Sequence, residues 1–326
     1  KMSNPSLDGL SKNHKVWGMK LRNIFALFLL VSSVLSFALQ AQDFKKEMKA
    51  IRTNLSITPN RNIEGTNVEL GITQWGIMSP LYYHKADKWA WGAGFRYELS
   101  DVDFSNTSLL NESTLHAIDL PVFAAYDQSD NLQWIFLFNP TLSGDFDHVS
   151  ADGMNYMTMA GARYKRSESF QWIFGAFYST GFNDNTFLPG IGFSWEPNDR
   201  SDFLFAGPIV RYRYSVTDSL DFVLDGKYSS NDWNTYNGGV ERDLTLRSYQ
   251  LSASLQWNFS EKQAVYGGVG VELAREIEIK NDAGGIHTDK DLKSPPLFEL
   301  GYRFRIDSLS KSRIACAASP RDIAPS

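Results

Sequence analysis

Charged residues of both signs stand two positions apart at several places in this chain. Arg211 and Arg213 form one such pair, and Asp221, Asp225 and Lys227 form another short series. Successive side chains of a β-strand point to opposite faces, so residues two positions apart share a face. Charges on one face, opposite an apolar face, indicate a polar interior where they pair with one another or select ions. The pattern places these residues in such an interior: Arg96, Glu98, Asp119, Arg163, Arg211, Arg213, Asp221, Asp225, Lys227, Glu272, Glu276, Glu299, Arg303 and Arg305.

Neighbouring segments bring some of these charges close together. A turn at residues 216–219 predicts that Arg211 lies near Asp225, and Glu272 or Glu276 is expected near Arg303 and Arg305. Such pairs would fill the interior and stabilise the fold, because an unpaired buried charge is costly. Alternatively, they would line a water-filled path that favours small charged or zwitterionic solutes. The sequence leaves both alternatives open.

Residues suited to catalysis are scarce. Downstream of residue 41 the imidazoles are His84, His116, His148 and His287. No spacing among them indicates a catalytic triad or a metal site, and Gly-rich phosphate-binding signatures are absent. We therefore expect solvated or hydrogen-bonded histidines, no cofactor and no enzymatic activity.

One acidic segment contains oxygen ligands of the kind that divalent cations prefer. It comprises Asp145, Asp147, His148 and Asp152, in the sequence DFDHVSAD. Hard cations bind clustered carboxylates, but this spacing does not match an EF-hand loop. Solvated loop charge is the expectation, with a calcium ion or a cation bridge to lipopolysaccharide as the alternative.

The elements that position the charges are strands with a two-residue period. Residues 249–259, YQLSASLQWNF, alternate strictly between apolar and polar side chains, and similar segments recur from about residue 64 to residue 306. This alternation is typical of strands with one apolar and one polar face. Either an antiparallel sandwich or a membrane barrel has such strands.

Strand length and the position of the aromatic residues favour the barrel. Eleven residues at about 3.4 Å per residue and a tilt of about 45° span about 25 Å, the height of a lipid-facing band. Trp89, Trp134, Trp172 and Trp257 stand near strand ends, as the aromatic girdles of such barrels do. We therefore predict an all-β fold, a transmembrane antiparallel up-and-down β-barrel.

The lengths of the connections predict the number of strands. Short turns at 84–88, 127–131, 165–169, 196–200, 216–219 and 260–263 alternate with longer Asp/Asn-rich segments near 100–113, 143–155, 180–186, 230–242 and 281–294. Barrels of the outer membrane have short periplasmic turns and longer outer loops. A tight outer turn at Gly207 and Pro208 and a first strand near 50–58 give about fourteen strands. Without them the count is twelve strands, and short turns no longer alternate with longer loops.

The N-terminal region has the pattern of a secretory signal. An apolar stretch at 24–38 follows Lys20 and Arg22, so we predict a signal peptide at 19–41 and an upstream extension foreign to the native protein at 1–18. The barrel is then expected at 42–307 and a polar disordered tail at 308–326. Cys316, in that tail, is the single cysteine, so an exported chain would have no internal disulfide. The net charge of −5 and the lack of a basic stripe exclude a nucleic-acid partner.

The last strand, Glu299-Leu300-Gly301-Tyr302-Arg303-Phe304-Arg305-Ile306, contains a polar residue, a glycine and two apolar residues at Glu299, Gly301, Phe304 and Ile306. This pattern resembles the C-terminal signal that the bacterial barrel-assembly machinery reads. The resemblance implies that machinery as a partner during biogenesis and outer-membrane lipid as the final environment. The signal normally ends a protein, whereas here about twenty residues follow it.

The middle of the chain resembles a family of uncharacterised outer-membrane barrel proteins of Gram-negative bacteria. The resemblance rests on FLPGIGFSWEPNDR at 187–200 and FAGPIVRYRYSVTDSLDF at 205–222. It implies the cell outer membrane as location and a barrel as architecture, and no activity or site residue.

Three functions remain as hypotheses. The first is a passive channel for small solutes, and the second is a closed structural or surface-binding barrel that acts through its outer loops. The third, an outer-membrane lipid hydrolase, would need a serine beside a histidine at the outer rim.

Overall fold

The computed structural model describes residues 49–105, 114–146, 153–180, 185–207, 209–237, 240–281 and 286–306. The predicted signal peptide, the upstream extension and the polar tail lie outside these residues. So do Asp147, His148 and Asp152, and the side chain of His287. Among the residues described, no helix is long and apolar enough to cross a membrane.

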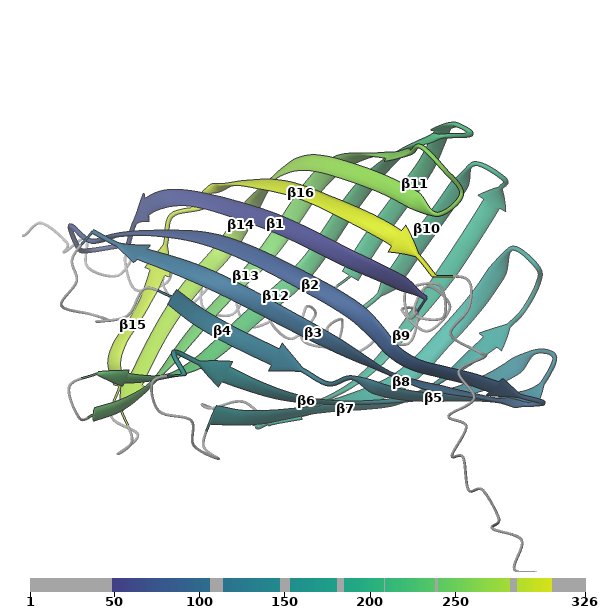
Figure 1. Cartoon of the computed structure of the whole chain (residues 1–326), viewed down its shortest axis with the longest axis horizontal. Coiled ribbons are helices and arrows are strands. Elements are labelled where there is room, and N and C mark those ends of the chain that lie inside the picture. The colour runs from purple at the N-terminus through teal and green to yellow at the C-terminus, as the bar shows by residue number, and fades with distance from the viewer. Residues whose placement is uncertain are drawn as a thin grey trace, which may run out of the picture.

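The described chain forms sixteen strand segments in one antiparallel sheet (Figure 1). They are β1 (Ala50–Asn62), β2 (Glu69–Ala86), β3 (Trp89–Phe104), β4 (Thr114–Asp119), β5 (Val122–Ser129), β6 (Leu132–Gly144), β7 (Met154–Lys165), β8 (Phe170–Thr180), β9 (Asn185–Asn198), β10 (Ser201–Ala206), β11 (Ile209–Thr217), β12 (Leu220–Asn237), β13 (Val240–Asn258), β14 (Gln263–Asn281), β15 (Ile286–Leu292) and β16 (Pro296–Arg305).

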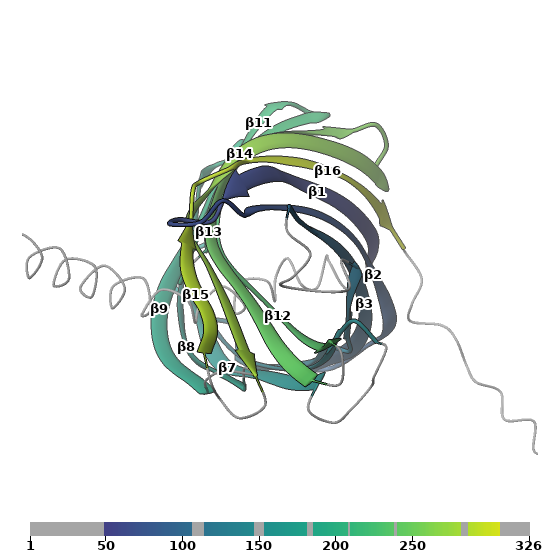
Figure 2. The same ribbon diagram turned by 90° about the vertical axis from the view of Figure 1, so that its left-hand side faces the viewer.

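These segments occupy fourteen positions in a closed ring, which confirms the predicted barrel. β4 and β5 share the same two neighbours, β3 and β6, and are one strand interrupted at Pro121. β15 and β16 both pair with β14 and are likewise one interrupted strand. β1 pairs with β16 along its length and closes the ring (Figures 1 and 2).

The outer surface of the ring is apolar because the alternating strands turn their apolar residues outward. Exposed side chains include Trp89, Trp134 and Trp257, each at least half exposed, near the turns that join β2 to β3, β5 to β6 and β13 to β14. We call this the short-turn end and the opposite end the long-loop end. An apolar belt with terminal aromatic residues is the surface of a transmembrane barrel.

Two predicted outer loops are strands in the structure, which corrects the boundaries given for them. The segment 230–242 is nearly all strand, because β12 and β13 pair from Leu220 with Trp257 up to Asn237 with Val240. Much of the segment 281–294 is β15, which pairs with β14. The polar composition of these segments obscured inward apolar residues such as Trp233 and Leu244.

A β-bulge in β14 changes which side chains point into the lumen and which point outward in the part of β14 that follows it. Arg247 faces Glu276, but Tyr249 faces Leu273, so β14 contains one extra residue. Ala274 adopts φ of 45° at this point. Because one extra residue moves every later side chain to the other face, the prediction that Glu276 points inward is wrong. Glu276 is exposed on the outer face, and Arg275 points inward and is buried.

The alternation of the sequence predicts a polar inner wall, but part of the inner wall is apolar in the structure. The wall cluster is an apolar set of buried inward residues from β2, β5, β6, β7, β8 and β10, namely Tyr83, Phe123, Ala125, Ile135, Leu137, Met159, Ile173, Leu204 and Ala206. On β6 it arises because residues 134–138 are apolar on both faces.

Candidate lumenal site

The charged side chains of the lumen pair mainly with neighbours along the wall. Arg211 Nε donates to Asp225 Oδ2 at 2.7 Å, between adjacent strands β11 and β12. Asp221 accepts from Ser215 Oγ at 2.8 Å and from Asn258 Nδ2 at 3.0 Å. These bonds hold the side chains against the sheet.

A second group of charges lies on β3 and its neighbours. The guanidinium of Arg96 contacts the carboxylate of Glu98 on the same strand and lies 3.8 Å from Asp119 on β4. Arg163 on β7 donates to Gln133 on β6, and Gln133 in turn donates to Asp127. Each link again joins one strand to itself or to an adjacent strand.

Glu272 has a partner that the sequence did not predict. Its carboxylate lies 2.9 Å from Nε of Arg275, whose side chain is fully buried, and it accepts from Gln250 at 2.9 Å. It was expected near Arg303 or Arg305. Arg275 was missed because the bulge at Ala274 has no signal in the sequence beyond a small residue.

One pair reaches across intervening strands. Lys227 on β12 lies 3.6 Å from Glu299 on β16, and β13 and β14 lie between them. Small inward residues such as Ser252 and Gly270, which face each other on these two strands, give the lysine room. This pair therefore spans two intervening strands, unlike the pairs between adjacent strands.

Four arginines gather on β1, β11 and β16, and we call Arg52, Arg213, Arg303 and Arg305 the arginine cluster. Arg52 stands directly opposite Arg303 in the β1–β16 ladder. The charges of Arg52, Arg305 and Arg213 all act on Arg303, with Asp221 as a nearby carboxylate. Arg303 donates to Asn258 Oδ1 at 3.1 Å. Like charges directly opposite each other are unfavourable, and a carboxylate, Asp202 on β10, stands directly opposite Arg213. Arg52 was missed although β1 alternates, with Ile51, Leu55 and Ile57 on one face and Arg52, Asn54 and Ser56 on the other.

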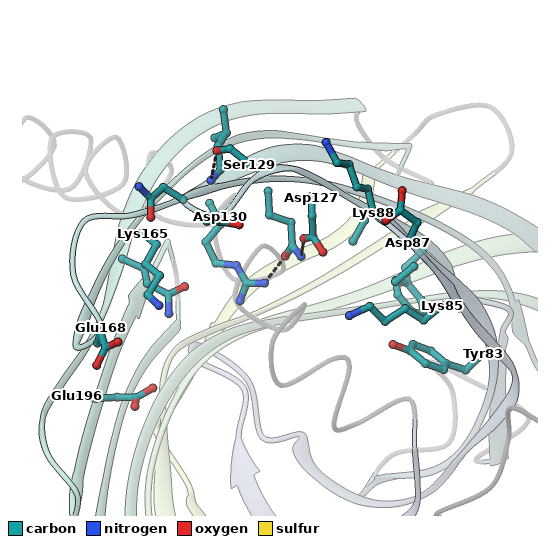
Figure 3. Close-up of a pocket in the computed structure, with 18 residues that line it drawn as sticks. Tyr83, Lys85, Asp87, Lys88, Asp127, Ser129, Asp130, Lys165, Glu168 and Glu196 are labelled. Carbon is teal, nitrogen blue, oxygen red and sulfur yellow. Dashed lines mark hydrogen bonds between the residues drawn. The ribbon is translucent and has the colours of Figure 1, made fainter.

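The short-turn end of the lumen contains a cavity of about 610 Å³ (Figure 3). Its polar lining includes Lys85, Asp127 and Lys165, and its apolar lining includes Tyr83 and Phe123 of the wall cluster. The cavity thus joins charged turn residues to the apolar part of the inner wall.

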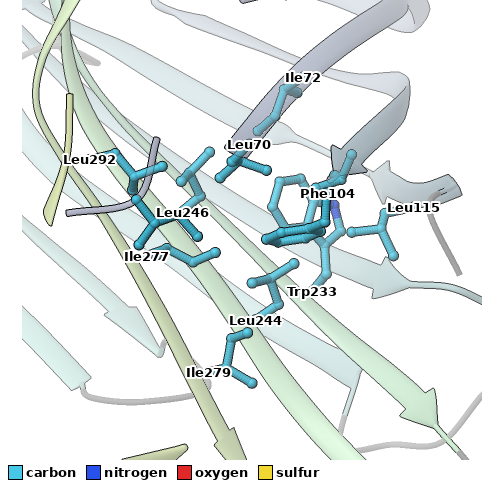
Figure 4. Packing of buried hydrophobic residues seen from close by; sticks show 12 residues of the cluster. Leu70, Ile72, Phe104, Leu115, Trp233, Leu244, Leu246, Ile277, Ile279 and Leu292 are labelled. Atoms are coloured by element: carbon cyan, nitrogen blue, oxygen red, sulfur yellow. The ribbon is translucent and has the colours of Figure 1, made fainter. Parts of the chain in front are cut away.

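Apolar residues fill the long-loop end. The end cluster consists of inward residues from opposite sides of the ring, namely Ile63, Leu70, Ile72, Val102, Phe104, Leu115, Trp233, Leu244, Leu246, Ile277, Ile279 and Leu292 (Figure 4). β12 also reaches β6 at this end, where Asn234 pairs with Gly144 and Ser143 Oγ donates to the carbonyl of Asp232 at 2.7 Å. The end cluster narrows the lumen here.

The histidines and the acidic segment show no catalytic arrangement among the described residues. His116 lies on the outer face of β4, where its Nδ1 is 2.8 Å from the hydroxyl of Tyr97. His84 stacks with Tyr82 near the short-turn end. Asp145 accepts from the backbone N–H of Tyr236 at 2.6 Å, so it positions β12. No group of potential metal ligands occurs in the described part of the chain.

The residues of the predicted assembly signal lie in the last strand, β16, or directly after it. Gly301 faces Tyr266 on β14, and a Cβ atom at Gly301 would overlap the tyrosine ring. Phe304 lies on the outward face and Ile306 follows the strand end. Gly301 thus has a packing role in addition to any role in assembly.

The Gly301–Tyr266 contact yields a test that separates these two roles. Gly301→Ala should reduce the refolded fraction in detergent, where no assembly machinery is present, because the new methyl displaces the Tyr266 ring. The double variant with Tyr266→Ala should recover it, since the ring is removed. The measurement is heat modifiability on a gel. A double variant that refolds as poorly as Gly301→Ala alone would contradict the packing role.

The family of the chain follows from a comparison with protein-family models. The model described as a domain of unknown function, DUF6268, matches residues 57–286, more than two thirds of the chain. The chain belongs to the DUF6268 family. This membership agrees with the uncharacterised barrel family that the sequence resembles. No curated protein matches this DUF6268 chain.

Solved structures similar to the DUF6268 barrel are outer-membrane proteins. An outer membrane channel from Pseudomonas putida F1 has 11% identity and a TM-score of 0.43, with 78% of this chain and 93% of that chain covered. A Pseudomonas aeruginosa FadL homologue has 11% identity and a TM-score of 0.41, with 78% and 89% covered. The P. putida toluene transporter TodX has 9% identity and a TM-score of 0.39, with 79% and 90% covered. Similarity at this level concerns the barrel architecture alone.

Proposed function

We propose that this protein is a channel for small solutes in the outer membrane of Gram-negative bacteria. The observation that supports it is the direction of the lumenal ion pairs. Arg211 with Asp225, and Arg96 with Glu98 and Asp119, lie along the wall. A plug would require pairs that cross the lumen from wall to wall.

The size of the ring is consistent with a path for solutes. About eight strands enclose an interior that side chains fill, whereas sixteen to eighteen leave an aqueous channel. The fourteen ring positions of this barrel fall nearer the second group. With the charged side chains held at the wall, water and small solutes can occupy the part of the lumen between the end cluster and the short-turn end.

The arginine cluster gives the channel a preference for anions. Arg303 and Arg305 lie on the last strand, and Arg52 on β1 faces Arg303. Rings or walls of positive charge favour anions in pores. Four cationic side chains lie together in this cluster, so the cluster sets the sign of the preference.

Conductance in planar bilayers tests the channel. Residues 42–307 should give discrete conductance steps with anion preference, and Arg303→Gln with Arg305→Gln should move the reversal potential in a salt gradient toward the nonselective value. Arg200→Gln is the matched control, since Arg200 lies exposed in a turn between β9 and β10. A folded, heat-modifiable barrel without conductance steps would refute the proposal.

A closed structural or surface-binding barrel is the second candidate, and the end cluster is the observation that favours it. Trp233 from β12 and Phe104 from β3 lie together in the end cluster (Figure 4), so the long-loop end is narrow. If this closure is permanent and complete, the outer surface of the long-loop end would carry the function.

A further inference from the structure

The cavity at the short-turn end is hollow because small residues line part of its wall. Ala90 on β3 faces Ala125 on β5, and in the next row toward the long-loop end Gly92 faces Phe123. A Cβ atom at Gly92 would lie 2.6 Å from the Phe123 ring, so the glycine lets that ring lie against the wall. The resulting volume of about 610 Å³ falls within the range of small-molecule sites, about 300–1,000 Å³.

An aromatic pair forms the apolar part of this wall. Tyr83 stacks on Phe123 with 6.2 Å between ring centroids and 21° between ring planes. The ammonium group of Lys49 lies 5.1 Å from the centroid of the Tyr83 ring. Because these two contacts hold the ring, Tyr83 directs its hydroxyl toward the middle of the cavity (Figure 3). The wall thus has a fixed surface for an apolar group, with a hydroxyl beside it.

Opposite charges in the row nearest the turns are held apart. Asp127 faces Gln133, and Gln133 faces Arg163. The side chain of Gln133 donates to Asp127 and accepts from Arg163. Two strand spacings of about 4.8 Å each therefore separate the backbones of the carboxylate and the guanidinium residues. A head group with a positive and a negative charge, hydrogen-bonded at each end, is of the size that spans this distance.

The whole lining contains charges of both signs. Its cations are Lys85, Lys88, Arg163 and Lys165, and its carboxylates are Asp87, Asp127, Asp130, Glu168 and Glu196. Lys85 lies on one side of the cavity, and Glu168 and Glu196 lie on the other (Figure 3). A lining of nearly equal numbers of cations and anions favours neither a net anion nor a net cation. It favours a ligand that contains both charges.

We propose that this cavity binds α-amino acids that have apolar side chains. Asp127 accepts hydrogen bonds from the ammonium group of the ligand, and Arg163 donates to its carboxylate. The apolar side chain occupies the hollow over Ala90, against the ring of Phe123. That such amino acids are also solutes of the channel rests on the proposed function, whereas the binding itself does not require conduction.

Isothermal titration calorimetry of the folded protein in detergent tests the site, with L-phenylalanine as the probe. Three analogues each lack one feature: 3-phenylpropanoate lacks the ammonium group, 2-phenylethylamine lacks the carboxylate, and glycine lacks the apolar side chain. We expect L-phenylalanine to bind and each analogue to bind at least about tenfold more weakly, because a hydrogen bond between charged groups or the burial of a phenyl ring accounts for such a factor. Absence of a saturable heat with L-phenylalanine would overturn the site. Equal binding of 3-phenylpropanoate would overturn the class of ligand.

Variants locate the binding in the cavity. Asp127→Asn should weaken the binding of L-phenylalanine at least about tenfold, because the amide keeps the size of the side chain and removes its charge. Asp218→Asn is the matched control, since Asp218 lies exposed in the turn between β11 and β12 at the same end of the barrel. Equal weakening by both variants would overturn the role of Asp127.

A second variant fills the hollow without changing a charge. Ala90→Leu should abolish the binding of L-phenylalanine, and heat modifiability on a gel verifies that the variant folds. Unchanged binding by the folded Ala90→Leu protein would overturn the cavity as the site. Conductance of the same proteins is an independent reading: binding without conductance steps refutes the channel and keeps the site, whereas conductance steps without binding keep the channel and refute the site.

Discussion

Glu272→Ala should lower the free energy of unfolding by about 3–5 kcal/mol, the usual cost of removing one partner from a buried ion pair. Glu272 lies 2.9 Å from Arg275, and both side chains are almost fully buried. Without the carboxylate, the guanidinium of Arg275 would remain charged in the lumen wall beside the end cluster, with one weak bond of 3.5 Å to the carbonyl of Leu70.

The control for this variant lies four residues along the same strand. Glu276→Ala should change the free energy of unfolding by no more than about 0.5 kcal/mol, because an exposed outer position tolerates substitution. The alternation of the sequence treats the two glutamates alike, and the bulge at Ala274 separates them.

Urea unfolding of the detergent-folded barrel, followed by tryptophan fluorescence, measures both effects. The double variant Glu272→Ala with Arg275→Met should recover most of the lost stability, since an apolar replacement of a buried pair is often neutral or favourable. Equal destabilisation by Glu272→Ala and Glu276→Ala would show that the bulge is absent and that both residues face the same side.

Trp233→Ala should both destabilise the barrel and increase its conductance. Trp233 is 1% exposed and belongs to the end cluster. Replacing a buried tryptophan by alanine costs about 3–5 kcal/mol. The cavity left between β12 and β3 would also widen the narrowest part of the lumen, so single-channel conductance should rise.

Trp257→Ala is the matched control, because Trp257 is 55% exposed on the outer face and contributes little to the lumen. It should leave conductance unchanged. If Trp233→Ala folds but conducts as the parent does, the end cluster does not limit the flow of ions. If the parent is silent and Trp233→Ala alone conducts, the closed structural barrel becomes the better description of the native state.

Much of the barrel could be predicted from the sequence because lipid imposes a strict rule on the outer face. Leu251, Leu255 and Trp257 must be apolar, and the polar residues between them identify the inner face. The tight turn at Gly207 was also predictable, since the alternation of short and long connections required it, and it sets the ring at fourteen positions.

The inner face was less predictable because no single solvent governs it. Ile135 and Leu137 are inward and buried, but an apolar residue between two lipid-facing ones gives no alternation to read. Similarly, Trp233 stands in an Asp/Asn-rich segment whose composition suggests a loop. Contacts across the lumen decide these positions, and such contacts join residues far apart in the chain.

The partners of the lumenal charges depended on registry. The single turn between β11 and β12 was short enough to place Arg211 beside Asp225. Glu272, by contrast, lies on the long strand β14, where a bulge at Ala274 changes the register. Arg303 stands opposite Ala264, at the other end of β14 from Glu272, so Glu272 could not reach Arg303 or Arg305, and the bulge brought Arg275 to it instead.

The seam between β1 and β16 has a consequence for the kinetics of folding. It joins Ala50 to Arg305, so the pairing that closes the ring has the largest sequence separation in the barrel. The entropy of closing so long a loop must be offset before any contact of the seam forms, and such nonlocal pairing slows folding. All the other ring strands can form by hairpin addition to a neighbour. Closure of the seam is therefore expected to be the slow step, and until it occurs the growing sheet exposes two free edges to aggregation.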